Sequence, residues 1–307
     1  MMKRGTAAIV SLLLALALLL AGCSQSTDTI SQNNSSTTEM ISEKDEGEST
    51  VQTGSYTTQE IKCLNGDYQI YGITYIPDDG REKHPLIIFS HELGNSHTSG
   101  IGYAERLSQI GYAVYVFDFY GGTVGGNQTG GKNTEMSVMT EISDLEAVLQ
   151  TAKSWDFVDA EKIILTGGSQ GGAVTALTGV RHQDEISGMI LLYPTLSLFS
   201  DIHERFSNLD SVPEQYDMFG GWITVGKKYA ADVWDIDPYQ ELSRYQGKVL
   251  LLHGDKDNSV DISYSDRASK VIPNVEYHVI SDGGHEFFGR PFEDAVTHIT
   301  SWLENNK

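Results

Sequence analysis

Short apolar runs alternate with amphipathic segments along the chain from about residue 56 onward. Continuous apolar runs at residues 85–90 and 112–118 predict strands that are buried on both faces, and further strands are predicted at residues 162–166, 189–193, 248–253 and 275–280. Apolar side chains recurring at helical spacing predict helices at residues 101–110, 138–152, 170–180 and 292–303. Strands that alternate with helices require a mostly parallel, doubly wound sheet with helices on both faces, so the predicted class is α/β.

Two segments depart from this alternation. Residues 56–76 are rich in β-forming side chains and are interrupted at Asn65-Gly66, a dipeptide that predicts a tight hairpin turn. Residues 195–246 separate two predicted core strands and carry many aromatic and glycine residues. An insertion of this length is usually functional, so we expect a lid or a substrate-binding wall, against the alternative of an excursion without a role.

The N-terminus reads as a targeting signal followed by a tether. Lys3 and Arg4 precede an apolar run at residues 7–20, which predicts a signal peptide over residues 1–22. The following Leu20-Ala21-Gly22-Cys23 resembles the lipobox of bacterial lipoproteins, which implies that Cys23 is lipidated after cleavage and anchors the protein to the outer face of the cell membrane. The alternative is an ordinary secretory signal with an incidental cysteine.

Composition then divides the rest of the chain. Residues 23–55 are dominated by Ser, Thr, Gln, Asn and Glu and bury too little apolar surface to fold, which predicts a flexible tether. Residues 56–307 form the predicted catalytic domain, and Cys63 is expected to be an unpaired, buried cysteine. The formal net charge of −21 argues against nucleic acid as a partner, because phosphate binding needs a basic surface.

The glycine-rich loop at residues 121–126 predicts no cofactor. It lacks the Gly-Lys-Ser/Thr ending of a phosphate-binding loop and is read as the turn after the strand at residues 112–118.

Ser169 is the strongest candidate for a chemical role. Gly167-Gly168-Ser169-Gln170-Gly171 directly follows a predicted strand and precedes a predicted helix, which is the context of a nucleophile elbow. Such a turn is so tight that the flanking positions need glycine, and it exposes the serine hydroxyl at the end of the sheet. The helix N-terminus behind it favours developing negative charge.

Serine is a weak nucleophile on its own and needs a base and an acid that orients the base. His285 follows the last predicted strand and is the candidate base. Asp255 and Asp257 both follow the strand at residues 248–253, and Asp282 is a third, weaker candidate for the acid. All of these positions fall at carboxyl ends of strands, where open α/β sheets place their sites.

A metal site is the competing interpretation of the same residues. His253, Asp255, Asp257 and His285 could be drawn as ligands, but no His-x-x-x-His or comparable spacing is present and the serine elbow would be left unexplained. The sequence therefore predicts no metal.

The order Ser, Asp, His and the elbow resemble those of the α/β-hydrolase superfamily. The segment after residue 253 is similar to the family's His-Gly-x-x-Asp-x-x-Val pattern, which implies Asp257 as the catalytic acid. The resemblance also implies an oxyanion hole built from the backbone N–H groups of Gln170 and Leu93. Glu92 departs from the glycine usual in that loop, and the neighbouring His91 is expected to brace the loop, with a role as a second base as the alternative.

Residues 68–303 resemble bacterial esterases of the feruloyl and cinnamoyl type. The resemblance rests on Asp118-Phe119-Tyr120-Gly121-Gly122, on the elbow, and on a region from Gly226 to Tyr239 that looks like their lid. It implies an extracytoplasmic serine hydrolase that cleaves small carboxylic esters without a cofactor. Aromatic residues of the insertion are expected either to line an acyl pocket or to pack the insertion onto the body, and the candidates chosen for substrate binding are Trp222, Tyr229 and Trp234.

Two other functions stay open at this point. The same fold carries serine peptidases, and many surface lipoproteins are non-catalytic binding proteins. A complete Ser, Asp and His set favours an enzyme.

Overall fold

The computed structural model describes residues 54–306. Its first element is a hairpin of β1 (Tyr56–Asn65) and β2 (Tyr68–Pro77), which pair antiparallel along their whole length. Gly66 has a φ of 56°, a left-handed conformation that glycine adopts without strain, so the Asn-Gly turn forms where the sequence predicts it. Residues 1–53 lie outside the described part, and with them the predicted signal peptide, Cys23 and most of the tether.

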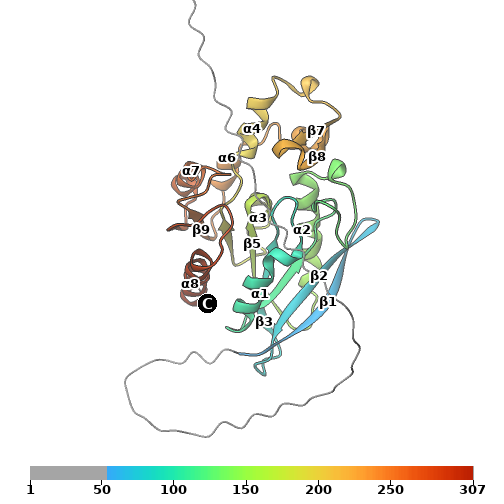
Figure 1. Cartoon of the computed structure of the whole chain (residues 1–307). Coiled ribbons are helices and arrows are strands. Elements are labelled where there is room, and N and C mark those ends of the chain that lie inside the picture. The colour runs from blue at the N-terminus through green and yellow to red at the C-terminus, as the bar shows by residue number, and fades with distance from the viewer. Residues whose placement is uncertain (1–53, 307) are drawn as a thin grey trace, which may run out of the picture. The chain divides into compact units, whose positions relative to one another are not determined.

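One twisted sheet forms the centre of the domain, with the strand order β1-β2-β4-β3-β5-β6-β9-β10 (Figure 1). Its remaining strands are β3 (His84–Ser90), β4 (Ala113–Phe117), β5 (Val158–Gly168), β6 (Gly188–Leu192), β9 (Lys248–Gly254) and β10 (Val275–Ile280). The pairs from β4 to β10 are all parallel, whereas β2 pairs antiparallel with both of its neighbours, β1 and β4. This sheet confirms the predicted α/β-hydrolase fold.

Helices cover both faces of the sheet, and alternate residues of each strand contact opposite helix layers. In β3, Ile87 and Phe89 pack with α1 (Ile101–Ser108) and α8 (Arg290–Asn305), whereas Leu86 and Ile88 belong to the core that contains α2 (Val138–Ala152), α3 (Ser169–Arg181) and α7 (Ser263–Val271). The continuous apolar runs of the sequence follow from this burial on two faces.

Helix α7 was not predicted from the sequence. Its apolar stripe is thin, because only Ser265 and Ala268 are fully buried within it. A helix with so few large apolar residues leaves little periodic signal.

Residues 195–246 form the lid, which lies above the sheet in Figure 1. It contains α4 (Leu198–Arg205), a two-stranded antiparallel sheet of β7 (Gln215–Met218) and β8 (Ile223–Gly226), α5 (Lys227–Ala231) and α6 (Pro238–Leu242). Buried lid side chains such as Tyr229, Ala230 and Leu242 join the same core as α2 and α3. The lid is therefore packed onto the body over most of its length.

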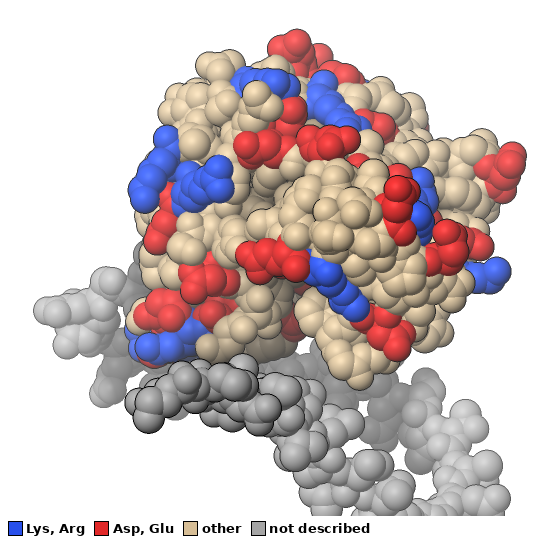
Figure 2. Space-filling view, turned by 90° about the horizontal axis from the view of Figure 1, so that it is seen from above, with Lys and Arg blue, Asp and Glu red and all other residues tan. Residues whose placement is uncertain are grey.

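The structure also bears on Cys63, on membrane-spanning helices and on the distribution of surface charge. Cys63 is buried without a disulfide, 3.7 Å from the hydroxyl of Tyr115. In residues 54–306, no helix is both long and apolar enough to cross a membrane. On the face of the described residues that is seen in Figure 2, acidic and basic side chains are interspersed.

Candidate active site

Ser169 stands at the turn between β5 and α3, as the elbow motif predicts. Its φ is 50°, a left-handed conformation that is rare for any residue other than glycine and that marks a strained turn. A Cβ atom at Gly167 would lie 2.4 Å from the carbonyl oxygen of Gly171, and one at Gly171 would lie 2.2 Å from that of Ser90. Side chains at these two positions would therefore force the turn open.

The side chains of Ser169, His285 and Asp257 form one chain of hydrogen bonds. The Oγ of Ser169 lies 2.8 Å from Nε2 of His285, and Nδ1 of His285 lies 2.8 Å from Oδ2 of Asp257. The residues come from the turns that follow β5, β10 and β9, which the parallel sheet brings to one edge. Geometry of this kind lets the imidazole accept the serine proton while the carboxylate holds the ring.

The structure separates the candidate acids. Oδ1 of Asp257 accepts hydrogen bonds from the N–H groups of Ser259 and Val260, at 2.8 Å and 2.9 Å. Asp255 instead accepts a hydrogen bond from the N–H of Asp282 at 2.7 Å, and Asp282 is exposed. Asp255 is thus a residue that ties two loops together, and only Asp257 reaches His285.

Burial opposes ionisation of Asp257, yet its pKa is lowered. Hydrogen bonds from His253, His285 and the backbone of Val260 outweigh the burial and hold the carboxylate in its charged form. His253 lies 3.2 Å from Asp257 with its own Nδ1 bonded to Ser265 Oγ, so it fixes the acid from behind. His253, which the competing metal interpretation would use as a ligand, therefore supports the catalytic acid instead.

Two residues that line the cavity beside Ser169, Gln170 and Leu93, have backbone N–H groups available to a substrate. Gln170 occupies the first turn of α3, where N–H groups have no partner within the helix. The N–H of Leu93 makes no hydrogen bond within residues 54–306, and both residues line the same cavity as Ser169. This pair can stabilise an oxyanion, as the sequence predicts.

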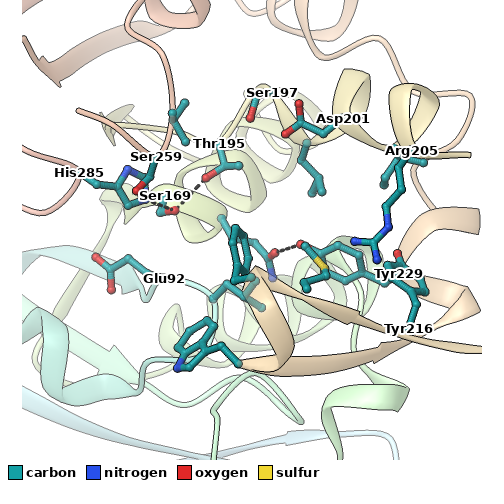
Figure 3. A pocket seen from close by; sticks show the side chains of 18 of the residues that line it. Glu92, Ser169, Thr195, Ser197, Asp201, Arg205, Tyr216, Tyr229, Ser259 and His285 are labelled. Carbon is teal, nitrogen blue, oxygen red and sulfur yellow. Dashed lines mark hydrogen bonds between the residues drawn. The ribbon is translucent and has the colours of Figure 1, made fainter. Parts of the chain in front are cut away.

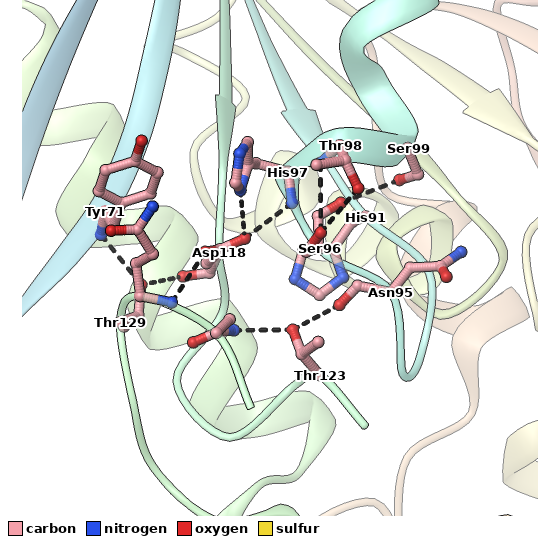
Figure 4. A network of polar contacts seen from close by, with 12 residues as sticks. Tyr71, His91, Asn95, Ser96, His97, Thr98, Ser99, Asp118, Thr123 and Thr129 are labelled. Atoms are coloured by element: carbon pink, nitrogen blue, oxygen red, sulfur yellow. Dashed lines mark hydrogen bonds and ion pairs between the residues drawn. The ribbon is translucent and has the colours of Figure 1, made fainter. Parts of the chain in front are cut away.

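The loop that carries Leu93 is held by the glycine-rich loop after β4. The N–H of Gly94 donates to the carbonyl of Gly122 at 2.8 Å, and the N–H of Val124 donates to the carbonyl of Gly94 at 3.0 Å. The hydroxyl of Thr123 donates to the carbonyl of Asn95 at 2.5 Å, within the network drawn in Figure 4. The glycine-rich segment thus supports the candidate oxyanion hole.

His91 and Asp118 complete this support. The N–H of Phe119 donates to Nε2 of His91, so Nδ1 carries the proton and donates to the carbonyl of Glu92 at 2.7 Å. Burial lowers the pKa of His91, which keeps the ring neutral for this arrangement. His91 therefore braces the loop, and Asp118 fixes its far end through the N–H and the ring of His97 (Figure 4).

Glu92 fits the oxyanion loop without backbone strain. Its φ is not positive, so the loop does not require glycine at this position. Its side chain is buried, with Oε1 accepting from the hydroxyl of Tyr193 at 2.9 Å and Oε2 accepting from the amide of Asn95 at 3.1 Å. The departure from the family pattern therefore places a carboxylate beside the catalytic residues and leaves the backbone intact.

A cavity of about 410 Å³ opens from Ser169 toward the lid. Figure 3 shows Ser169, Thr195 and His285 at one end and Arg205, Tyr216 and Tyr229 at the other. Trp222 and Tyr229 line it, whereas Trp234 does not. The ring of Trp234 packs against His203 at 4.3 Å between centroids, so the prediction that it binds substrate is wrong and the packing alternative holds for it.

Tyr229 also anchors the side chain of Gln170. Its hydroxyl donates to Oε1 of Gln170 at 2.5 Å, and Nε2 of Gln170 donates to Glu141 at 2.8 Å. The pKa of Glu141 is raised to about 8, chiefly by burial; the hydrogen bond from Gln170 opposes the rise, and the nearby charge of Asp144 adds to it. A lid residue and a helix of the body are therefore joined through the residue that follows Ser169.

Thr195 is a site residue that the sequence analysis missed. Its hydroxyl lies 2.8 Å from Oγ of Ser169, and its N–H donates to the carbonyl of Ser169 at 2.9 Å. Since the single hydroxyl proton of Ser169 is directed to His285, the Thr195 hydroxyl donates to the serine oxygen. Its position just after β6, at the same edge of the sheet, was the available signal.

Residues 102–306, more than half of the chain, match the prolyl oligopeptidase family. The chain belongs to that family. With the elbow and its hydrogen-bonded His and Asp, the protein is a serine hydrolase of the α/β-hydrolase fold. This match confirms the predicted superfamily. The matched family is described as one of peptidases.

Individual relatives are distant. The chain is 25% identical to human dipeptidyl peptidase 8 over 225 residues, which is 68% of this chain but only 24% of the peptidase. It is 22% identical to the quorum-quenching protein AidA of Acinetobacter baumannii over 264 residues, covering 72% of this chain and 86% of AidA. Est1E from Butyrivibrio proteoclasticus, solved with ferulic acid bound, has a TM-score of 0.72 at 23% identity and covers 80% of this chain and 98% of its own. That structural likeness concerns the fold.

Proposed function

We propose that the protein hydrolyses small carboxylic esters through an acyl-enzyme on Ser169. The observation that carries the proposal is the chain of hydrogen bonds from Asp257 through His285 to Ser169, which ends in a cavity of about 410 Å³. A nucleophile, a base and an oriented acid meet there beside two backbone donors.

In the acylation step, Oγ of Ser169 attacks the ester carbonyl carbon and its proton passes to Nε2 of His285. The carbonyl oxygen becomes an oxyanion between the N–H groups of Leu93 and Gln170. Asp257 stabilises the resulting imidazolium and is not protonated itself. His285 then gives the proton to the alcohol oxygen as the carbon–oxygen bond breaks, and the alcohol leaves.

Water completes the cycle. His285 takes a proton from a water molecule that attacks the acyl carbon, and the same two N–H groups stabilise the second oxyanion. Collapse of that intermediate returns the proton to Ser169 and releases the carboxylic acid. The Thr195 hydroxyl, 2.8 Å from the serine oxygen, keeps Oγ oriented in the resting enzyme.

The shape of the cavity supports an ester with a compact, apolar acyl group. Its lining includes Leu198, Ile202, Phe206, Met218 and Trp222, and it ends beneath the lid at Tyr216 and Tyr229. Such a mostly apolar space suits an acyl chain or ring. Est1E, which binds ferulic acid, has the same fold, and we therefore include feruloyl and cinnamoyl esters among the candidate substrates.

We also propose that the enzyme works outside the cytoplasm, held to the membrane by lipid on Cys23. The support is the sequence Leu20-Ala21-Gly22-Cys23 after an apolar segment. Two acyl chains would give stable anchoring, whereas one would give only marginal binding. Cell fractionation of wild type and Cys23→Ala tests this, because the variant should leave the membrane fraction.

A peptidase activity is the second candidate, favoured by the family match over residues 102–306. The same triad would cleave an amide if the leaving amine were bound and protonated by His285. A panel of p-nitrophenyl butyrate, methyl ferulate and an aminoacyl p-nitroanilide separates the two. Faster turnover of the two esters supports the proposal, and faster turnover of the anilide would replace it with the peptidase.

Ser169→Ala is the variant that tests catalysis itself. Loss of the serine of a triad costs about 10⁶-fold in kcat in a comparable enzyme, so the variant should show no measurable turnover on any member of the panel. A wild-type protein that turns over none of them, yet binds the esters, would indicate a binding protein instead.

A further inference from the structure

Strand β10 forms one end of the central sheet, opposite the hairpin of β1 and β2 (Figure 1). Among the strands of residues 54–306 it pairs with β9 alone, in parallel. Its six residues, Val275–Ile280, therefore present a free edge to the outside, which we call the β10 edge. A free edge is a row of backbone donors and acceptors with which another strand can pair.

The outward backbone groups of the β10 edge belong to alternate residues. The carbonyls of Asn274 and Ile280 accept hydrogen bonds from the β9 side, at 2.9 Å and 3.1 Å. Because the backbone groups of successive residues point to opposite sides of a strand, Val275, Tyr277 and Val279 direct their N–H and C=O groups away from β9. These three residues make no backbone hydrogen bond within residues 54–306, so their outward groups are available to a second strand.

The side chains of the β10 edge divide between two faces of the sheet. Tyr277 turns toward α7, where its hydroxyl donates to Oδ1 of Asp266 at 2.9 Å. His278 turns toward α8, where its ring stacks on the ring of His298 with centroids 4.0 Å apart. Glu276 shares that face, and its Oε1 lies 2.8 Å from Nε2 of His278. The α8 face of the edge therefore carries one carboxylate and one imidazole side by side.

This pattern is complementary to a second copy of itself in antiparallel orientation. With Tyr277 on the two-fold axis, the outward backbone groups of the two strands meet, and Glu276 of each copy lies opposite His278 of the other. A carboxylate opposite an imidazole gains a hydrogen bond, or an ion pair when the imidazole is protonated. On the other face Val279, which is 49% exposed, lies opposite Val275 of the other copy and becomes covered.

The side chains also select this register over its neighbours. Since outward backbone groups must meet outward groups, the next symmetric registers centre on Glu276 or on His278. The first places two carboxylates opposite each other, and the second places two imidazoles opposite each other. Like charges directly opposite each other destabilise a strand pair, so only the register centred on Tyr277 makes both pairs favourable.

We propose that the protein forms a two-fold dimer through the β10 edge, in which the sheets of two copies join into one continuous sheet. Strand β10 contains neither Lys nor Pro, residues that commonly protect an edge strand from pairing, whereas β1 at the other end of the sheet carries Lys62. The dimer does not depend on which substrate Ser169 acts on, because no residue of β10 lines the cavity at Ser169.

Sedimentation equilibrium tests whether the dimer forms. The measurement uses the full chain with Cys23→Ala, which removes the proposed lipid attachment and its thiol, while Cys63 is buried. We expect a species of twice the mass of the chain at micromolar concentration. A monomer at every concentration up to about 100 μM, which excludes a Kd tighter than that value, would overturn the proposal.

Charge variants in the same background assign the dimer to the β10 edge. Glu276→Lys removes both carboxylate–imidazole contacts across the axis and should weaken dimerisation about tenfold in Kd. Adding His278→Glu exchanges the two charges, so opposite charges face each other again and most of the affinity should return. Glu60→Lys is the matched control, since Glu60 is an exposed acid of β1 that contacts Lys62, and it should keep the unsubstituted Kd. An unchanged Kd in Glu276→Lys, or no recovery in the double variant, would contradict the assignment.

Disulfide formation reports the register. Residues directly opposite each other in a non-hydrogen-bonded antiparallel pair have Cα atoms about 4.5 Å apart, close enough for a disulfide. A mixture of Glu276→Cys and His278→Cys proteins should therefore form a cross-linked dimer, in which peptide mass spectrometry finds these two positions joined. Neither variant should cross-link by itself. No cross-link in the mixture, or efficient cross-linking of either variant alone, would overturn the proposed pairing.

Discussion

The catalytic edge and the lid differ in what fixes the positions of their side chains. The catalytic edge comprises the turns after β5, β9 and β10 that carry Ser169, Asp257 and His285, and the lid is residues 195–246. In the catalytic edge, each side chain is placed by the end of a buried parallel strand, so its location follows from the order of the strands. In the lid, elements of four to eight residues are placed by packing onto the body.

The difference shows in which residues touch the cavity. The three predicted catalytic residues are hydrogen-bonded to one another, whereas two of the three predicted aromatic residues of the lid line the cavity and the third packs on His203. Motifs at strand ends specify the position of a side chain, whereas an aromatic residue in an insertion does not specify which surface it will contact.

The largest effect should separate two neighbouring acids of the catalytic edge. Replacing the acid of a triad by its amide leaves the geometry but lowers kcat by about 10⁴-fold, so Asp257→Asn should lose that much activity on p-nitrophenyl butyrate. Asp255→Asn keeps an oxygen that can accept from the N–H of Asp282 and removes only the charge, so it should stay within about threefold of wild type. Steady-state kinetics checks both, and similar losses in the two variants would break the distinction.

Glu141 lies where the body meets the lid, and it should make the free energy of unfolding depend on pH. Glu141 has its pKa raised to about 8, from an ordinary value of 4.5, so the folded protein holds a proton that the unfolded chain releases as the pH rises between these values. Its contribution to the free energy of unfolding is complete below pH 4.5 and should fall by about 4 kcal/mol as the pH rises to 8.

Glu141→Gln should remove that fall, because glutamine does not titrate. Urea unfolding of wild type and variant at several pH values between 4.5 and 8 measures it. Glu146→Gln, at a less buried position of the same helix, should keep the wild-type slope. A slope unaltered by Glu141→Gln would mean that this carboxyl does not couple the body to the lid as described.

Within the lid, replacing Trp222 should affect substrate binding, whereas replacing Trp234 should affect stability. Trp222 lines the cavity beside Gly94, so Trp222→Ala should raise KM for methyl ferulate by about tenfold through lost apolar contact. Trp234→Ala should lower the free energy of unfolding by about 1–2 kcal/mol and leave KM near the wild-type value. Kinetics and urea unfolding of both variants check this, and an effect of Trp234→Ala on KM alone would reverse the comparison.

The smallest expected effect concerns Thr195, where the lid begins at the catalytic edge. Thr195→Val keeps the shape and removes the hydroxyl that donates to Ser169, at a cost typical of one neutral hydrogen bond, about 1 kcal/mol. We expect kcat to fall about fivefold with KM unchanged. Thr195→Ser, which restores the hydroxyl, should recover most of the rate, and failure of that rescue would point to a structural role for the residue.

Much of the fold could be predicted because parallel strands are continuous apolar runs. The strands β3, β4, β6 and β9 lie where those runs indicate, and the turn at Gly66 lies where Asn-Gly indicates. Helix α7 and the lid elements could not be predicted, since the helix has little apolar stripe and the lid elements are too short for periodicity to register.

The candidate site likewise contains residues that the sequence predicts and residues that it does not. Ser169, His285 and Asp257 follow from motifs whose spacing is fixed by the strands. The roles of Thr195 and His253 depend on side chains from separate turns meeting in space, which no local pattern records. Glu92 could be recognised as a departure, but only the contacts with Tyr193 and Asn95 show what it does.

The most direct test of the central claim is covalent labelling with a fluorophosphonate, followed by peptide mass spectrometry. If Ser169 is activated by His285 and Asp257, wild type should carry a single adduct on Ser169. Ser169→Ala should carry none, and Asp257→Asn should react far more slowly. An unlabelled wild type, or equal labelling of Ser169→Ala, would contradict the account.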